Sequence, residues 1–145
     1  MRRNLNPLLK WGCLIPLGVV LPLVFAAMAL DRFLPSAARR ALPASASDVQ
    51  EYYSGSVDYV RCLKAKLPEG DVVLYARNLN LTSRFDPVED AKIASMVNIG
   101  IGDAPKWWNP PSASASSYFR YAPGKERVEV LRYSDGYVYY LVTAW

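Results

Sequence analysis

The sequence predicts a single small α+β domain, preceded by one apolar helix. Three observations support this class. A stretch without charged side chains lies near the N-terminus, β-rich segments separated by turn residues fill the last third of the chain, and a helical pattern lies between them. The 145 residues suffice for one hydrophobic core and an appended segment. We divide the chain into a basic flank (1–10), an apolar helix (11–33), a linker (34–46) and the domain (47–145).

The apolar stretch runs from Trp11 to Leu30, between the charged residues Lys10 and Asp31. A helix of about 20 residues spans about 30 Å, which is the thickness of the hydrocarbon core of a bilayer. Trp11 is of the type that anchors helices at the membrane interface. We therefore expect residues 11–33 to contact membrane lipid as a transmembrane anchor.

A secretory signal peptide is the alternative interpretation of this stretch, with cleavage at Ala27-Met28-Ala29. The apolar run is long for a signal peptide, which favours the uncleaved anchor. Basic residues flank the run on both sides: Arg2, Arg3, Lys10, Arg32, Arg39 and Arg40. An N-terminal signal anchor ordinarily exports the chain that follows it. We expect a cytoplasmic N-terminus with the domain outside, in the periplasm or at the cell surface, or a secreted domain if cleavage occurs near Ala29.

The positive charge of the chain belongs to its first forty residues. The whole chain has a net charge of +4, and residues 1–40 hold six basic side chains against one acidic side chain. Residues 41–145 therefore carry a net charge of −1. Nucleic-acid-binding domains concentrate basic side chains on the folded part, so we expect no nucleic-acid partner. Arg39 and Arg40 have two interpretations: they contact acidic lipid, or they belong to a solvated linker.

Histidine is absent from the sequence, and two cysteines are present. The absence excludes histidine as a general base, as the activator of a nucleophile and as a metal ligand. Cys13 lies in the apolar stretch and Cys62 in the domain, so two thiolates do not make a metal site and a disulfide between them is not expected. We expect Cys62 to be a small buried apolar residue. No phosphate-binding glycine loop or nucleophile motif is present, and we expect no enzyme activity, metal or cofactor.

The first part of the domain shows a helical pattern followed by an extended one. Ser45 or Ser47 can cap a short helix that runs to about Tyr53 and ends at Gly55. The next segment, Val57–Leu67, places apolar side chains on one side at a period of two, which favours a strand. The same residues also permit a helix.

A second helix is predicted after Pro68, with Asp71 as a candidate cap. Its apolar stripe consists of Val72, Val73, Ala76 and Leu79. The pattern then fades into loops, with a turn of helix near Val88–Met96. The acidic residues Asp86, Glu89 and Asp90 resemble a divalent-cation patch only weakly. We interpret them as ordinary acidic residues at a helix N-terminus.

The last third of the chain predicts three strands, over Ser117–Ala122, Glu126–Ser134 and Gly136–Ala144. Asp135-Gly136 between two of them is a strong hairpin signal. The last strand is apolar on both faces, which is typical of a central strand. We expect an antiparallel sheet of three or four strands, with one or two helices packed on one face.

The most distinctive candidates for binding are aromatic. Trp107 and Trp108 lie in a loop, and Tyr118 and Tyr121 lie in the strand that follows. Exposed Trp and Tyr side chains are good anchors for a protein partner or a sugar ring. The alternative is that these rings fill the core of a small sheet.

These observations favour a membrane-anchored, non-catalytic protein of the cell envelope that binds another, unknown envelope protein. The candidate interaction surface consists of Trp107, Trp108, Tyr118 and Tyr121. One alternative is a domain that binds a cell-wall or surface glycan through the same rings. The other is an enzyme that works without histidine.

Overall fold

The computed structural model describes residues 19–26, 34–55, 59–90, 104–122, 124 and 127–144. The chain forms two compact units, Met1–Ser36 and Ala37–Trp145. In the first unit, residues 19–26 are helical. No helix in the described ranges is long and apolar enough to span a membrane. The remainder of the predicted anchor, residues 11–18 and 27–33, lies outside these ranges.

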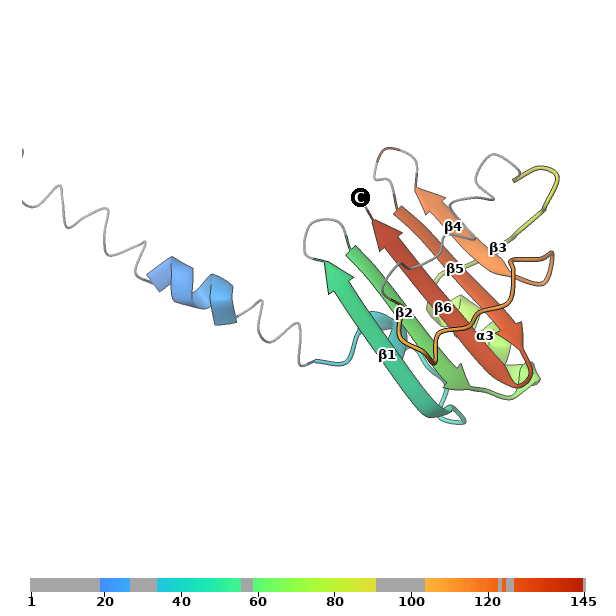
Figure 1. Ribbon diagram of the computed structural model, residues 1–145, viewed down its shortest axis with the longest axis horizontal. Coiled ribbons are helices and arrows are strands. Elements are labelled where there is room, and N and C mark those ends of the chain that lie inside the picture. Colours follow the sequence, from blue (N-terminus) through green and yellow to red (C-terminus); the bar gives the residue numbers. More distant parts are fainter. Residues whose placement is uncertain are drawn as a thin grey trace, which may run out of the picture. The chain divides into compact units, whose positions relative to one another are not determined.

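The second unit is built on one antiparallel sheet of six strands in the order β1-β2-β6-β5-β4-β3 (Figure 1). The strands are β1 (Ser47–Gly55), β2 (Tyr59–Lys66), β3 (Ser83–Arg84), β4 (Tyr118–Ala122), β5 (Arg127–Ser134) and β6 (Tyr137–Ala144). The prediction that the last strand is central is confirmed, because β6 lies between β2 and β5. The α+β class is also confirmed, whereas the predicted sheet of three or four strands is too small.

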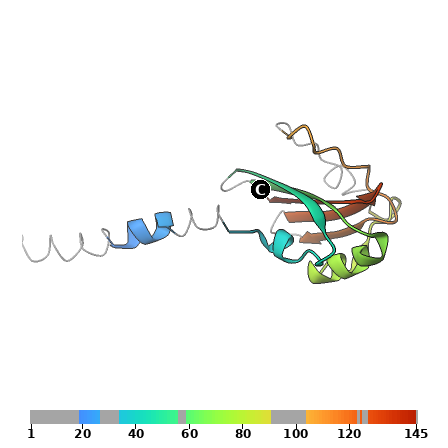
Figure 2. The same ribbon diagram turned by 90° about the horizontal axis from the view of Figure 1, so that it is seen from below.

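Helices cover one face of this sheet, and an extended loop crosses the other (Figure 2). The helices are α2 (Ala37–Arg40) and α3 (Val72–Asn78), the latter preceded by the 3-10 turn η1 (Glu69–Asp71). We call their side of the sheet the helix face. The opposite side is the loop face, and the described segment 104–117 that lies over it is the aromatic loop.

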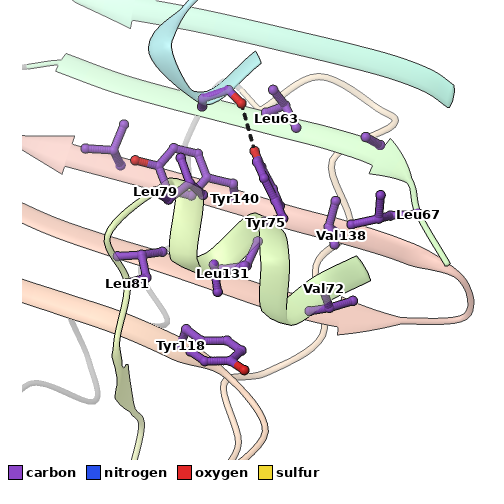
Figure 3. Close-up of a cluster of buried hydrophobic side chains, with 14 residues drawn as sticks. Leu63, Leu67, Val72, Tyr75, Leu79, Leu81, Tyr118, Leu131, Val138 and Tyr140 are labelled. Carbon is purple, nitrogen blue, oxygen red and sulfur yellow. Dashed lines mark hydrogen bonds between the residues drawn. The ribbon is translucent and has the colours of Figure 1, made fainter. Parts of the chain in front are cut away.

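The main hydrophobic core lies between α3 and the helix face (Figure 3). Alternate residues of β2, β6 and β5 point into it, because side chains of a strand alternate between the two faces. Its largest buried side chains are Leu63, Leu67, Tyr75, Leu81, Leu131, Val138 and Tyr140. The Tyr75 hydroxyl crosses this core and donates a hydrogen bond to the carbonyl of Ala38 at 3.2 Å. A smaller cluster on the loop face contains Phe85, Val128 and Val130.

The folded unit begins ten residues before the predicted domain boundary at residue 47. Ala38 of α2 is buried in the main core. The side-chain amide of Asn78, at the end of α3, donates to the carbonyl of Ala41 at 2.9 Å. Much of the predicted linker 34–46 is therefore part of the domain.

The predicted helix from Ser45 or Ser47 to Tyr53 is wrong, because this segment is strand β1. The chain is extended here, and β1 pairs regularly with β2 from Gln50 to Gly55. Tertiary pairing outweighs the local capping signal here. The predicted end at Gly55 is correct, and its φ of 97° is one that glycine adopts readily.

The other predicted elements are confirmed with small shifts of their boundaries. The extended interpretation of Val57–Leu67 corresponds to β2, and the second helix corresponds to α3. In α3 the exposed Val73 does not belong to the buried stripe. Asp71 occupies the N-cap position without a side-chain capping bond, and instead accepts a hydrogen bond from Ser45. Residues 87–90 form turns, and the rest of the predicted helical turn lies outside the described residues.

Candidate functional site

The structure places the four aromatic residues predicted as a surface on both sides of the sheet. Trp107 and Trp108 lie in the aromatic loop, above the loop face. Tyr121 packs partly buried against the small cluster on the same face. Tyr118 is buried in the main core, on the helix face. Tyr118 is therefore removed from the candidate surface.

Tyr118 has a structural environment of its own. The Arg84 guanidinium stacks on its ring, with Cζ 3.7 Å from the ring centroid. The same guanidinium donates to the Tyr118 hydroxyl at 2.6 Å and to the carbonyl of Ser116. These contacts join β3 to the start of β4.

The two tryptophans are fixed against each other and against the sheet. Their rings form an edge-to-face pair with centroids 6.0 Å apart and an interplanar angle of 90°. Trp108 also packs on Tyr139 of β6, at 5.8 Å and 64°. Both indoles are half-buried, so each ring keeps accessible surface while its orientation is fixed.

Lys64 of β2 holds the aromatic loop on the loop face. Its ammonium group donates to the side-chain oxygen of Asn109 at 3.1 Å and to the carbonyl of Trp107 at 3.4 Å. The same group lies 4.8 Å from the ring centroid of Tyr137 and 5.1 Å from that of Tyr139. One cation thus joins the loop to two strand tyrosines by hydrogen bonds and by cation–π attraction.

A second basic residue anchors the loop further along. Arg132 of β5 is buried on the loop face and donates to the carbonyl of Pro111 at 3.0 Å. Burial lowers the pKa of Arg132 to about 10, so the guanidinium stays charged at neutral pH. The loop ends in a turn in which Ser117 donates its backbone N–H to the carbonyl of Ser114 at 2.8 Å.

These contacts define one surface, which we call the aromatic patch: Trp107, Trp108, Tyr137 and Lys64. Tyr121 lies apart from it. Tyr121 pairs with Val128 of β5, which pairs with Thr143 of β6, and Thr143 is four residues beyond Tyr139. Sequence reasoning found the tryptophans by their composition, but it did not find Lys64 or Tyr137, whose positions depend on strand register.

The buried charged cluster of the molecule lies on the helix face and was not predicted. Glu129 is only 3% exposed. Its Oε1 accepts hydrogen bonds from Arg120 at 2.6 and 3.2 Å and from Arg127 at 2.9 Å, and its Oε2 accepts one from the Tyr140 hydroxyl at 2.7 Å. Both carboxylate oxygens are thus occupied, which is the arrangement of a structural ion pair. The signal in the sequence was Arg127 and Glu129 two residues apart, on one face of a strand.

Two further candidates have structural explanations. The Asp86 carboxylate accepts hydrogen bonds from the backbone N–H groups of Val88 and Glu89 at 2.8 and 3.2 Å, so it caps a turn. No group of three or more metal-binding side chains occurs in the part of the chain that the structure describes. Cys62 is fully buried, and burial, assisted by Glu51, raises its thiol pKa to about 12. Its thiol is therefore unreactive, in accord with the prediction of a buried apolar residue.

The aromatic patch offers indole N–H groups, a phenol, an ammonium group and apolar ring surface. Such groups contact a partner by shape, apolar burial and a few hydrogen bonds. Comparison of this chain with family models, with curated proteins and with solved structures found no match in any of the three.

Proposed function

We propose that this chain is a membrane-anchored, non-catalytic module that binds another protein of the cell envelope through the aromatic patch. One observation carries the proposal. Trp108 packs on Tyr139, Trp107 packs edge-to-face on Trp108, and Lys64 binds the backbone carbonyl of Trp107, yet both indoles remain partly exposed.

A fixed aromatic surface is well suited to binding. Trp and Tyr dominate the energetics of protein interfaces because they bury a large area and lose little side-chain entropy. The contacts of Lys64 and Tyr139 order the loop before any partner arrives, which lowers the cost of binding.

The geometry of the rings favours a protein over a glycan. A sugar ring stacks on a flat aromatic surface. Here the Trp107–Trp108 pair meets at 90° and the Trp108–Tyr139 pair at 64°, so neighbouring rings do not form a common plane. A notched surface of perpendicular rings is better matched to the side chains of a protein.

The predicted anchor determines where in the cell this surface acts. The apolar run ends at Leu30, and the folded unit begins at Ala37. Six residues reach about 20 Å when fully extended. With the apolar run up to Leu30 in a bilayer, this length keeps the domain within about 20 Å of the membrane surface, where we expect its partner to be an envelope protein.

The test is capture of partners from detergent-solubilised membranes by the full chain. The double substitution Trp107→Ala and Trp108→Ala removes the centre of the patch and leaves the core on the helix face intact. We expect partner capture to weaken at least 30-fold, since a hot-spot residue contributes about 2 kcal/mol or more. Val88→Ala, at a position 84% exposed, is the matched control and leaves capture unchanged.

Two results would count against the proposal. Equal capture by the double variant and the wild type places the binding site elsewhere. Binding of the chain to purified insoluble wall material, lost in the double variant, assigns the patch to a glycan instead. Equal urea unfolding midpoints for the variants show that a loss of capture is not a loss of folding.

A further inference from the structure

Strand β1 forms a long edge of the sheet. It pairs with β2 on one side, and no strand of the described residues pairs with its other side (Figure 1). An edge strand presents a row of backbone N–H and C=O groups that can pair with another chain. Natural edge strands are usually protected by proline, charged side chains (lysine above all), a β-bulge, an inward-pointing charge or short length.

β1 has only part of this protection. Its charged residues are Asp48 and Glu51, and its nine residues include no proline, lysine or arginine. The one irregularity in its pairing lies at the start, between Ser47 and Gln50, and pairing is regular from Gln50 to Gly55. The opposite edge differs, because β3 has two residues and is followed by Asp86-Pro87.

We propose that β1 pairs antiparallel with β1 of a second copy of this chain, which joins the two sheets into one. The pairing goes beyond the proposed function, and it does not use the aromatic patch. We take a second copy of β1 as the pairing partner because an antiparallel strand can pair with itself. A two-fold axis through such a pair places one residue opposite its own equivalent.

The side chains of β1 select the register. An axis at Glu51 sets two carboxylates directly opposite each other, which is destabilising. An axis at Tyr53 leaves the first residues of the regular segment unpaired. An axis at Tyr52 pairs Tyr52 with Tyr52, Gln50 with Ser54 and Glu51 with Tyr53. It uses most of the regular segment, sets two aromatic rings opposite each other and places no like charges directly opposite each other.

The symmetry of this pairing keeps the helix faces of the two copies on one side. The two-fold axis of an antiparallel pair runs normal to the sheet, so both copies turn the same face to the same side. Because α2 packs on the helix face, the α2 helices of both copies lie on the same side of the joined sheet.

Disulfide cross-linking in membranes tests the register. In full-length chain with Cys13→Ser and Cys62→Ala, Tyr52→Cys places two thiols at the axis. Directly opposite Cα atoms lie about 4.5–5.5 Å apart, within the range that a disulfide spans. Ser54→Cys is the matched control on the same face of β1. In this register its equivalents are offset by about four residues, or about 13 Å, which is too far.

We expect oxidation to convert most of the Tyr52→Cys chain to a species of twice the chain mass, and little of the Ser54→Cys chain. Absence of this species, equal cross-linking of both variants, or cross-linking of Tyr52→Cys to a different protein would each overturn the proposal.

A second measurement does not depend on cysteine. Tyr52→Lys opposes two ammonium groups at the axis, and we expect it to weaken self-association of the full chain in detergent at least 10-fold by light scattering. A monomeric wild type overturns the pairing while leaving capture through the aromatic patch intact. Loss of capture in the tryptophan variant with dimers preserved overturns the proposed function alone.

Discussion

Glu129 shows how an acidic side chain is accommodated inside the sheet. Its carboxylate receives N–H groups from Arg120 and Arg127 and the hydroxyl of Tyr140. The Arg120 and Arg127 side chains are each about two-fifths exposed, so the positive groups of the cluster are in contact with solvent. The carboxylate itself depends on these partners to offset its loss of hydration.

We predict that Glu129→Gln lowers the free energy of unfolding by about 1.5–3 kcal/mol, the usual contribution of hydrogen bonds to a charged group. The amide keeps the shape of the side chain and loses the charge that Arg120 and Arg127 contact. Urea unfolding measures the change. Glu89→Gln, at an exposed position, is the control and is expected to be neutral. Equal stability of the Glu129 variant and the wild type would contradict the structural role.

Cys62 makes stability depend on pH at the alkaline end. Its folded pKa of about 12 lies above the pKa of about 8.5 of an unfolded cysteine. The folded thiol keeps its proton where the unfolded one loses it. The stabilisation is therefore complete below about pH 8.5 and is lost as pH rises toward 12.

In the Cys13→Ser chain we predict that Cys62 contributes a loss of about 1.4 kcal/mol between pH 7.5 and 9.5, a range in which tyrosine, with a pKa of about 10, has only begun to titrate. Cys62→Ala is less stable at both pH values, but it lacks most of this difference. Denaturant midpoints at the two pH values measure it. An equal pH dependence in both chains would contradict the assignment to Cys62.

Residues of the site were predictable only in part. Trp107 and Trp108 stand out by composition alone. The contact of Lys64 with the carbonyl of Trp107 joins residues 43 positions apart, and it depends on how the loop crosses the sheet. Local sequence does not determine contacts between residues so far apart. For the same reason Tyr118 was predicted to lie on the same surface as the tryptophans, whereas it lies on the other face of the sheet.

At the scale of elements, turn chemistry was the most reliable signal. Asp135 and Gly136, between β5 and β6, have φ angles of 53° and 81°, as a two-residue hairpin turn of type I′ requires. β1 was the least reliable, because its capping serines indicated a helix while its pairing with β2 imposes a strand. Nonlocal pairing decides such a segment.

The hairpin turn permits a controlled test. Neither Gly136 nor Gly70 has an atom within 4 Å of an added Cβ, and of the two only Gly136 has a positive φ. We predict that Gly136→Ala lowers the free energy of unfolding by about 1–2 kcal/mol, because L-residues are strained there. Gly70→Ala is expected to be neutral or slightly stabilising. Thermal unfolding compares them, and equal effects of the two substitutions would contradict the strained turn.

At the scale of the whole molecule, the sequence predicted the α+β class, the central position of β6 and the helix layer on one face. It underestimated the sheet by β1, which was predicted as a helix, and by the two-residue strand β3. β1 joins the C-terminal strands through β2, whose Leu63 pairs with Tyr140, 77 residues away. Such long-range register is set by the packing of the core and has no local signature.

The central claim is that the aromatic patch recognises a protein partner at the membrane. The direct measurement is photo-cross-linking in intact cells, with a benzophenone amino acid replacing Trp107 in the full chain and, as the control, replacing the exposed Val88. We predict a discrete cross-linked species at position 107 that position 88 does not give. No cross-linked species at position 107, or the same species from both positions, would contradict the claim.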